Sequence, residues 1–153
     1  MTVFDQEKEQ GDWFPFFNSH YDLSTGEILY DPPEEGAAEF CFRSPAQFWQ
    51  DRQKGRTKQY KMVLNPSTRQ MERVGYFDDL SPDEQQAERD DSWDYCITGI
   101  KNARWSESGP EMECTRENKL KLVKNAAWLR YANRVLQIIL ETGVKVKEDA
   151  EKN

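Results

Sequence analysis

The sequence predicts an α+β fold, in which a small N-terminal antiparallel β-meander packs against three to five α-helices. Two observations support this class: turn residues separate short runs of strand formers before residue 43, and helix-start motifs followed by apolar residues at helical spacing come after it. A chain of 153 residues fits one domain. We expect that single α+β domain over 12–143, between a disordered tail at 1–11 and a charged C-terminal tail at 144–153.

The expected strands lie close together in the first 42 residues. Ser24-Thr25-Gly26 separates Tyr21 from Ile28-Leu29-Tyr30, which is typical of a hairpin turn between strand formers. Glu39–Phe42 predicts a third short strand, with its two phenylalanines on one face and Cys41 on the other. Together these strands predict a meander that needs a helix to cover one face.

The first helix start is Ser44-Pro45-Ala46-Gln47, where a capping residue precedes a proline at the first helical position. We expect Phe48 and Trp49 to face the core. Further apolar residues at helical spacing predict that the helix continues and that a short helix runs to Gly75. These residues are Tyr60, Val63, Leu64, Met71 and Val74, with Asn65-Pro66 as a break.

The second helix start is Ser81-Pro82-Asp83-Glu84, a complete capping box with acids in the first turn. Apolar residues follow at helical spacing from Trp93 to Ile100, so we expect this helix to end near Lys101. Residues 104–113 predict a loop or small hairpin that turns at Ser108-Gly109-Pro110.

The last third of the chain predicts helix again. Thr115 is suited to cap a helix start, and Gly143 is suited to end a helix. Asn125 is the one helix breaker between them, so one long helix or two consecutive helices are both compatible with 115–143. The apolar stripe of this segment contains Trp128, Tyr131, Val135, Ile138 and Ile139, widened by Leu136 and Leu140.

The charge is unevenly distributed along the chain. The formal net charge is −7, yet residues 43–73 hold eight bases against two acids. We expect this basic segment, including 52–61, to lie against acidic neighbours in the fold or to form solvated faces. Aromatics interleave with it, as in some single-strand binders, but the acidic balance of the chain argues against direct nucleic-acid binding.

The residue types that catalysis or metal binding requires are sparse. His20 is the single histidine, and Cys41, Cys96 and Cys114 are too widely spaced for a zinc motif or a disulfide framework. No glycine-rich phosphate loop is present. We therefore expect no enzyme activity, no metal and no cofactor, although the sequence does not define a role for His20. An acidic, polar start and the lack of a long apolar run favour a cytoplasmic protein without a membrane span.

One pattern resembles a known family. It comprises Trp93-Asp94-Tyr95, Ile97-x-Gly99, Glu113-Cys114-Thr115-x-Glu117-Asn118-Lys119, an aromatic-led helix and Glu151-Lys152-Asn153. This order is similar to tail assembly chaperones encoded by long-tailed bacteriophages and prophages. Asp22-x-x-Thr25-Gly26-Glu27-Ile28-x-Tyr30 and Asn65-Pro66-x-Thr68-Arg69-x-Met71-Glu72 resemble a subgroup of the same proteins.

The resemblance implies a non-enzymatic protein of the host cytoplasm that binds tape measure or tail tube subunits during virion morphogenesis and self-associates. An apolar helical stripe can dock a partner helix, so Trp128, Tyr131, Val135 and Ile139 are the predicted partner-binding residues. Taken residue by residue, the same stripe fits the core of the domain itself better than a docking surface. The alternative function is an acidic phage-encoded inhibitor that mimics DNA and blocks a host nucleic-acid-binding protein.

Overall fold

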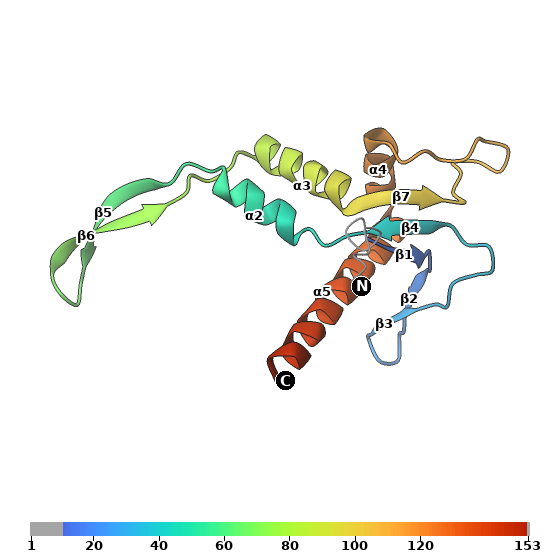
Figure 1. Ribbon diagram of the computed structural model, residues 1–153, viewed down its shortest axis with the longest axis horizontal. Helices are drawn as coiled ribbons and strands as arrows, with labels where there is room; N and C mark the ends of the chain where they lie inside the picture. The colour runs from blue at the N-terminus through green and yellow to red at the C-terminus, as the bar shows by residue number, and fades with distance from the viewer. Residues whose placement is uncertain (1–10, 153) are drawn as a thin grey trace, which may run out of the picture.

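The computed structural model describes the backbone of residues 11–152 and the side chains of residues 11–142. Within these residues the chain forms three antiparallel sheets and four helices, so the predicted α+β class is confirmed (Figure 1). The predicted tail at 1–11 lies almost wholly outside the described residues.

The central sheet has three strands in the order β1-β4-β7: β1 (Asp12–Pro15), β4 (Glu39–Phe42) and β7 (Ile97–Lys101). A separate antiparallel hairpin consists of β2 (Ser19–Tyr21) and β3 (Ile28–Tyr30). Strands β2, β3 and β4 are therefore present where the sequence predicts strands, whereas β1 is an additional strand that the sequence does not predict. Their pairing differs in one respect, because β4 lies between β1 and β7 and does not pair with β3. β4 is largely buried and pairs with a strand on each side, whereas every residue of β3 is exposed.

The core lies between the central sheet and helix α5 (Ala126–Lys152). Phe40 and Phe42 on β4 are buried and contact the rings of Trp128 and Tyr131. The Tyr131 hydroxyl also donates a 2.6 Å hydrogen bond to the Phe14 carbonyl oxygen on β1. The aromatic residues of the chain thus join the sheet to the long helix, and they provide large buried areas from few side chains.

Two helices lead away from this core. Helix α2 (Ala46–Lys54) follows β4, and helix α3 (Pro82–Cys96) precedes β7, so the two lie side by side as a stalk (Figure 1). At the far end of the stalk, β5 (Gln59–Asn65) and β6 (Gln70–Tyr76) form a two-stranded hairpin, which we call the arm.

The prediction of helix between Tyr60 and Gly75 is wrong, because these residues form the arm. Polar and apolar residues alternate from Gln59 to Met62, and Met62-Val63-Leu64 is then a continuous apolar run, a pattern that is compatible with a strand as well as with a helix. The turn decides between them: Asn65 Oδ1 accepts a 2.9 Å hydrogen bond from the Ser67 amide, and Arg69 adopts a φ of 57°. The hairpin turn then brings the two strands into register.

The expectation that Phe48 and Trp49 face the core is also wrong. Phe48 is partly buried against Tyr95 of α3, with ring centroids 5.7 Å apart, and Trp49 is exposed. The stalk extends beyond the sheet, so the apolar side of α2 meets only α3. The predicted cap is not formed as expected, because α2 has Pro45 at its N-cap position and no side-chain capping bond there, although Ser44 Oγ accepts a 3.2 Å hydrogen bond from the Ala46 amide.

Helix α3 begins at the predicted capping box, with Ser81 and Glu84 bonded reciprocally, but it ends at Cys96 and not near Lys101. Residues Ile97–Lys101 instead pair with β4. Their β-branched side chains favour a strand. Gly99 also fits there for a packing reason: an added Cβ would lie 2.5 Å from the Trp13 ring.

The C-terminal segment forms two helices, which settles the question left open by its sequence. Helix α4 (Arg116–Val123) begins at Thr115, whose side chain accepts from the Asn118 amide as predicted. Asn125 separates α4 from α5 and caps α5, because its Oδ1 accepts a 3.1 Å hydrogen bond from the Trp128 amide. The expected end at Gly143 is wrong, since α5 continues to Lys152. A single glycine destabilises a helix by only about 1 kcal/mol, and the helix-forming residues on both sides of Gly143 can offset this cost.

Candidate functional site

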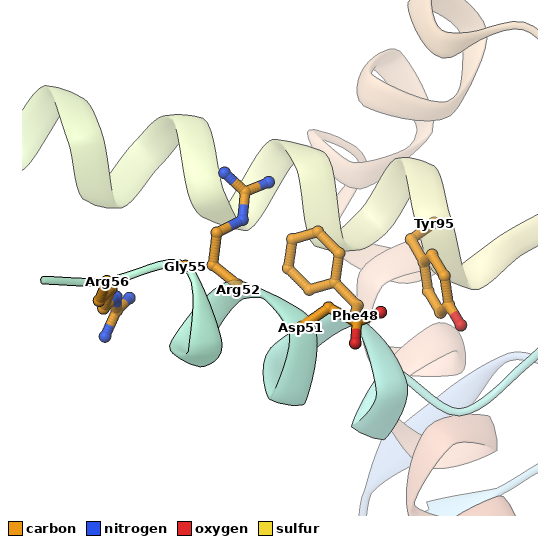
Figure 2. A pocket seen from close by; sticks show the side chains of 6 residues that line it. All are labelled: Phe48, Asp51, Arg52, Gly55, Arg56 and Tyr95. Carbon is orange, nitrogen blue, oxygen red and sulfur yellow. The ribbon is translucent and has the colours of Figure 1, made fainter.

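A groove on the stalk is the first candidate site. It is a hollow of about 420 Å³ between α2 and α3. Figure 2 shows Phe48 and Arg52 of α2 extending toward α3, next to Tyr95. Asp51, Gly55 and Arg56 complete the lining.

The arginines of the groove are paired with carboxylates of α3. Arg56 bonds both carboxylate oxygens of Glu88, at 2.9 and 2.7 Å, and Arg52 lies 2.9 Å from Asp91. Asp91 also accepts a 2.8 Å hydrogen bond from Arg116 of α4. This bond and the one from Arg52 hold the pKa of the Asp91 carboxyl below its usual range, against the opposing effect of burial. The prediction that the basic segment lies against acidic neighbours is thus confirmed for Arg52 and Arg56.

Stacked rings and cations continue along the same groove. The Arg43 guanidinium lies 3.7 Å from the centre of the Tyr95 ring, and Arg52 lies 5.0 Å from that of Phe48. Such contacts between cations and rings contribute roughly 0.5–1 kcal/mol each at exposed sites. The ion pairs and cation–ring contacts along this groove therefore hold α2 against α3, and the arginines that line it are already paired with groups of the same chain.

The residues that could support chemistry are dispersed. His20 Nδ1 lies 2.9 Å from Asp31 Oδ1 at an exposed position. Cys41 and Cys96 are buried, whereas Cys114 is exposed, and burial raises the pKa of the Cys96 thiol to about 11. Among the described residues, no group of three or more His, Cys, Asp or Glu side chains could hold a metal ion.

A second hollow, of about 430 Å³, lies beside the N-terminus of α5. Its floor is apolar and includes Phe40, Met112, Leu122 and Trp128. The indole Nε1 of Trp128 is buried and has no hydrogen-bond acceptor among the described residues. Residues 102–105 also line this hollow. They overlap the predicted loop or small hairpin at 104–113, within which Arg104 and Glu111 form an isolated bridge.

The predicted partner-binding residues lie on α5, and three of the four belong to the core. The exposed fractions of Trp128, Tyr131 and Val135 are 3%, 1% and 0%. Ile139 is partly buried and packs against the same cluster. In this fold the first three contact the domain itself, so a partner can reach only the far end of the stripe.

The apolar side chains that do face solvent are on other elements. On the arm, Tyr60, Met62, Leu64 and Met71 are each exposed by 51% to 57%. The helical spacing of the apolar residues predicts helices here, and a helical prediction gives no indication of this surface. The alternation from Gln59 to Met62, shortly before a turn at Asn65-Pro66, is the signal that could reveal it.

Comparisons of the chain with known protein families, with curated proteins and with solved structures find no match. Within the described residues, no helix is both long enough and apolar enough to cross a membrane.

Proposed function

We propose that this protein is a non-enzymatic interaction protein, similar to a phage tail assembly chaperone, that binds a tape measure or tail tube subunit in the host cytoplasm through α5. The observation that carries the proposal is the apolar surface of α5 beyond the core. Leu140 is 64% exposed there, next to Leu136 and Ile139, which are only partly buried.

The geometry of α5 suits helix docking. The helix has 27 residues and is therefore about 40 Å long, while its buried contacts with the sheet fall between Trp128 and Val135. Figure 1 shows its C-terminal half extending away from the sheet. At about 100° per residue, Leu136, Ile139 and Leu140 fall within one arc of about 100°, a width that an amphipathic partner helix can cover.

The resemblance of residues 93–119 to tail assembly chaperones supports this class of partner. These residues form the end of α3, β7, the following loop and the start of α4, so the motif lies in the sheet and in the helix that precedes α5. The alternative of a DNA-mimicking inhibitor gains less support. Glu88 and Asp91, which belong to its acidic segment, are paired with arginines of the same chain.

The test is co-expression with a tape measure protein of a long-tailed phage, followed by affinity capture. Covering the exposed part of a leucine is worth about 2 kcal/mol, so Leu140→Lys should weaken the complex roughly 30-fold. Gln137→Lys is the matched control, because it places the same charge at an exposed position one turn away. We expect Gln137→Lys to bind as the wild type does, and the wild-type complex to persist at high salt because apolar contacts dominate it.

Two outcomes would contradict the proposal. If the wild-type protein captures no tail protein, the proposal that it binds a tape measure or tail tube subunit is wrong. Equal loss with Leu140→Lys and Gln137→Lys would show that charge, and not the apolar surface of α5, governs binding.

A further inference from the structure

The arm has two different faces. Residues directly opposite in an antiparallel pair share a face, and every second residue along a strand returns to it. By this register one side of the arm, which we call the Tyr60 face, carries five exposed side chains: Tyr60, Met62, Leu64, Met71 and Arg73. The face therefore combines an aromatic ring, three apolar side chains and a guanidinium.

Two cations lie beside the ring of Tyr60. The Arg73 guanidinium lies 4.0 Å from the centre of the ring, and Lys58 Nζ lies 5.8 Å from it. Lys58 reaches this side because Gly75, directly opposite Tyr60, has no side chain, and a Cβ added there would overlap Lys58 Cε. The Tyr60 side chain is still 51% exposed, so its ring offers surface to a ligand next to two positive charges.

The cations of this face lack carboxylate partners. Among the described residues, Lys58 and Arg73 form no ion pair, and neither does Arg69 in the turn of the arm. The arginines of the stalk differ, because Arg52 and Arg56 are paired with carboxylates of α3. Positive charge is thus neutralised along the stalk but not on the arm.

The acidic groups of the arm lie on its opposite face. Glu72 faces that way and accepts a 2.8 Å hydrogen bond from Asn65 Nδ2. Asp78, which follows β6, accepts a hydrogen bond from Gln59, whose side chain also belongs to the opposite face. Lys61 lies there as well. Within the arm, the Tyr60 face and the turn therefore carry three positive charges and no carboxylate.

We propose that the Tyr60 face of the arm binds single-stranded nucleic acid without sequence preference. Proteins of this class combine cations that contact phosphates with rings on which bases stack. The bases of a single strand leave their faces free for such stacking, whereas those of a duplex are stacked on one another. In this arrangement Lys58, Arg69 and Arg73 contact phosphates, Tyr60 stacks on one base, and the apolar side chains nearer the turn pack against the next.

The acidic balance of the whole chain does not prevent this contact. The paired strands of the arm have seven residues each, so the arm is about 23 Å long. Figure 1 shows it at the end of the stalk that lies away from the central sheet. This length exceeds the Debye length of about 8 Å at physiological ionic strength, so the turn is largely screened from acidic groups beyond the base of the arm. The net charge of −7 therefore does not describe the surroundings of the Tyr60 face.

The test is the fluorescence anisotropy of a labelled oligodeoxythymidylate of about 20 nucleotides, titrated with the full chain. We expect a dissociation constant of about 10⁻⁶–10⁻⁴ M at physiological salt, and three phosphate contacts predict a roughly 20-fold loss of affinity between about 50 and 200 mM salt. A duplex of the same length should bind roughly fivefold more weakly or worse, because its bases cannot stack on Tyr60. Poly-glutamate should bind more weakly for the same reason.

Two pairs of variants test the face itself. Tyr60→Leu removes the ring and should raise the dissociation constant roughly tenfold, whereas Tyr60→Phe keeps the ring and should bind as the wild type does. Arg73→Gln should weaken binding and reduce the slope of log affinity against log salt by about 0.7. Lys61→Gln is its matched control, because it removes the same charge from the opposite face and should change neither quantity. Circular dichroism of each variant confirms that it folds.

Four results would overturn the proposal. They are an unchanged anisotropy with the wild type at low salt, equal affinity for the single strand and for either the duplex or poly-glutamate, a folded Tyr60→Leu variant that binds as the wild type does, and equal losses with Arg73→Gln and Lys61→Gln. This contact is separate from the client site on α5, so its failure would leave the α5 proposal standing.

Discussion

Removal of the Tyr131 hydroxyl tests how α5 is held to the sheet. The Tyr131 ring is buried among Phe16 and Phe17, at centroid distances of 5.1 and 5.0 Å, and its hydroxyl donates to the Phe14 carbonyl. Burial raises the pKa of Tyr131 well above its usual range, so the hydroxyl keeps its proton and remains a donor. In Tyr131→Phe the ring stays, but the carbonyl loses this donor.

The expected loss follows from this geometry. Leaving a buried acceptor without its donor costs about 1–3 kcal/mol, so Tyr131→Phe should lower the free energy of unfolding by that amount. Tyr131→Ala also removes the ring and creates a cavity, for a total of about 3–5 kcal/mol. The assay is urea unfolding, monitored by far-ultraviolet circular dichroism. The slope m of the unfolding free energy against urea concentration should stay the same in all variants, which would show that the folded and unfolded states are themselves unaltered.

The same pair of variants separates a core residue from a docking residue. If Tyr131 served mainly to bind a partner, Tyr131→Ala would leave the free energy of unfolding unchanged and would reduce client capture. That result, or a Tyr131→Phe variant as stable as the wild type, would refute the assignment of this residue to the core.

Two further predictions concern Cys96 and Asn125. Burial raises the pKa of the Cys96 thiol from its ordinary value of 9.0 to about 11, so the folded state favours the protonated form. The contribution of the Cys96 thiol to stability should therefore be complete below pH 9 and lost as the pH rises through 11. In Cys96→Ala, the fall in the free energy of unfolding between these two pH values should be about 3 kcal/mol smaller than in the wild type. Equal falls for the two proteins in urea titrations would contradict this prediction. Asn125→Ala removes the cap on the Trp128 amide and should cost about 1 kcal/mol, measured by thermal unfolding with Asn133→Ala, an exposed site in α5, as control.

The features that the sequence alone could predict are those set by neighbouring residues. The capping box at Ser81–Glu84, the cap at Thr115 and the hairpin turn at Ser24-Thr25-Gly26 each depend on hydrogen bonds within a few positions. All three are present in the structure. The residue type of Asn125 predicts a helix breaker, but only the structure shows that it divides the segment into α4 and α5.

One wrong prediction from the sequence concerns a segment whose structure depends on a strand far along the chain. Ile97–Lys101 continues the spacing of α3, but pairing with β4, more than fifty residues earlier, makes it a strand. The arm shows the reverse case, where a local turn at Asn65 outweighed an apolar spacing that also suits a helix. Periodicity alone cannot choose between these states over short apolar runs.

What the sequence determined by itself was the fold class, the main helix starts and the presence of one strong apolar stripe at the C-terminal end. Only the tertiary structure decided how that stripe is used. Trp128, Tyr131 and Val135 are covered because β4 presents Phe40 and Phe42 to them, whereas Leu140 lies beyond the edge of the sheet and stays exposed. An apolar side chain has the same character in a core and in a docking surface, and the elements packed over it decide which of the two it becomes.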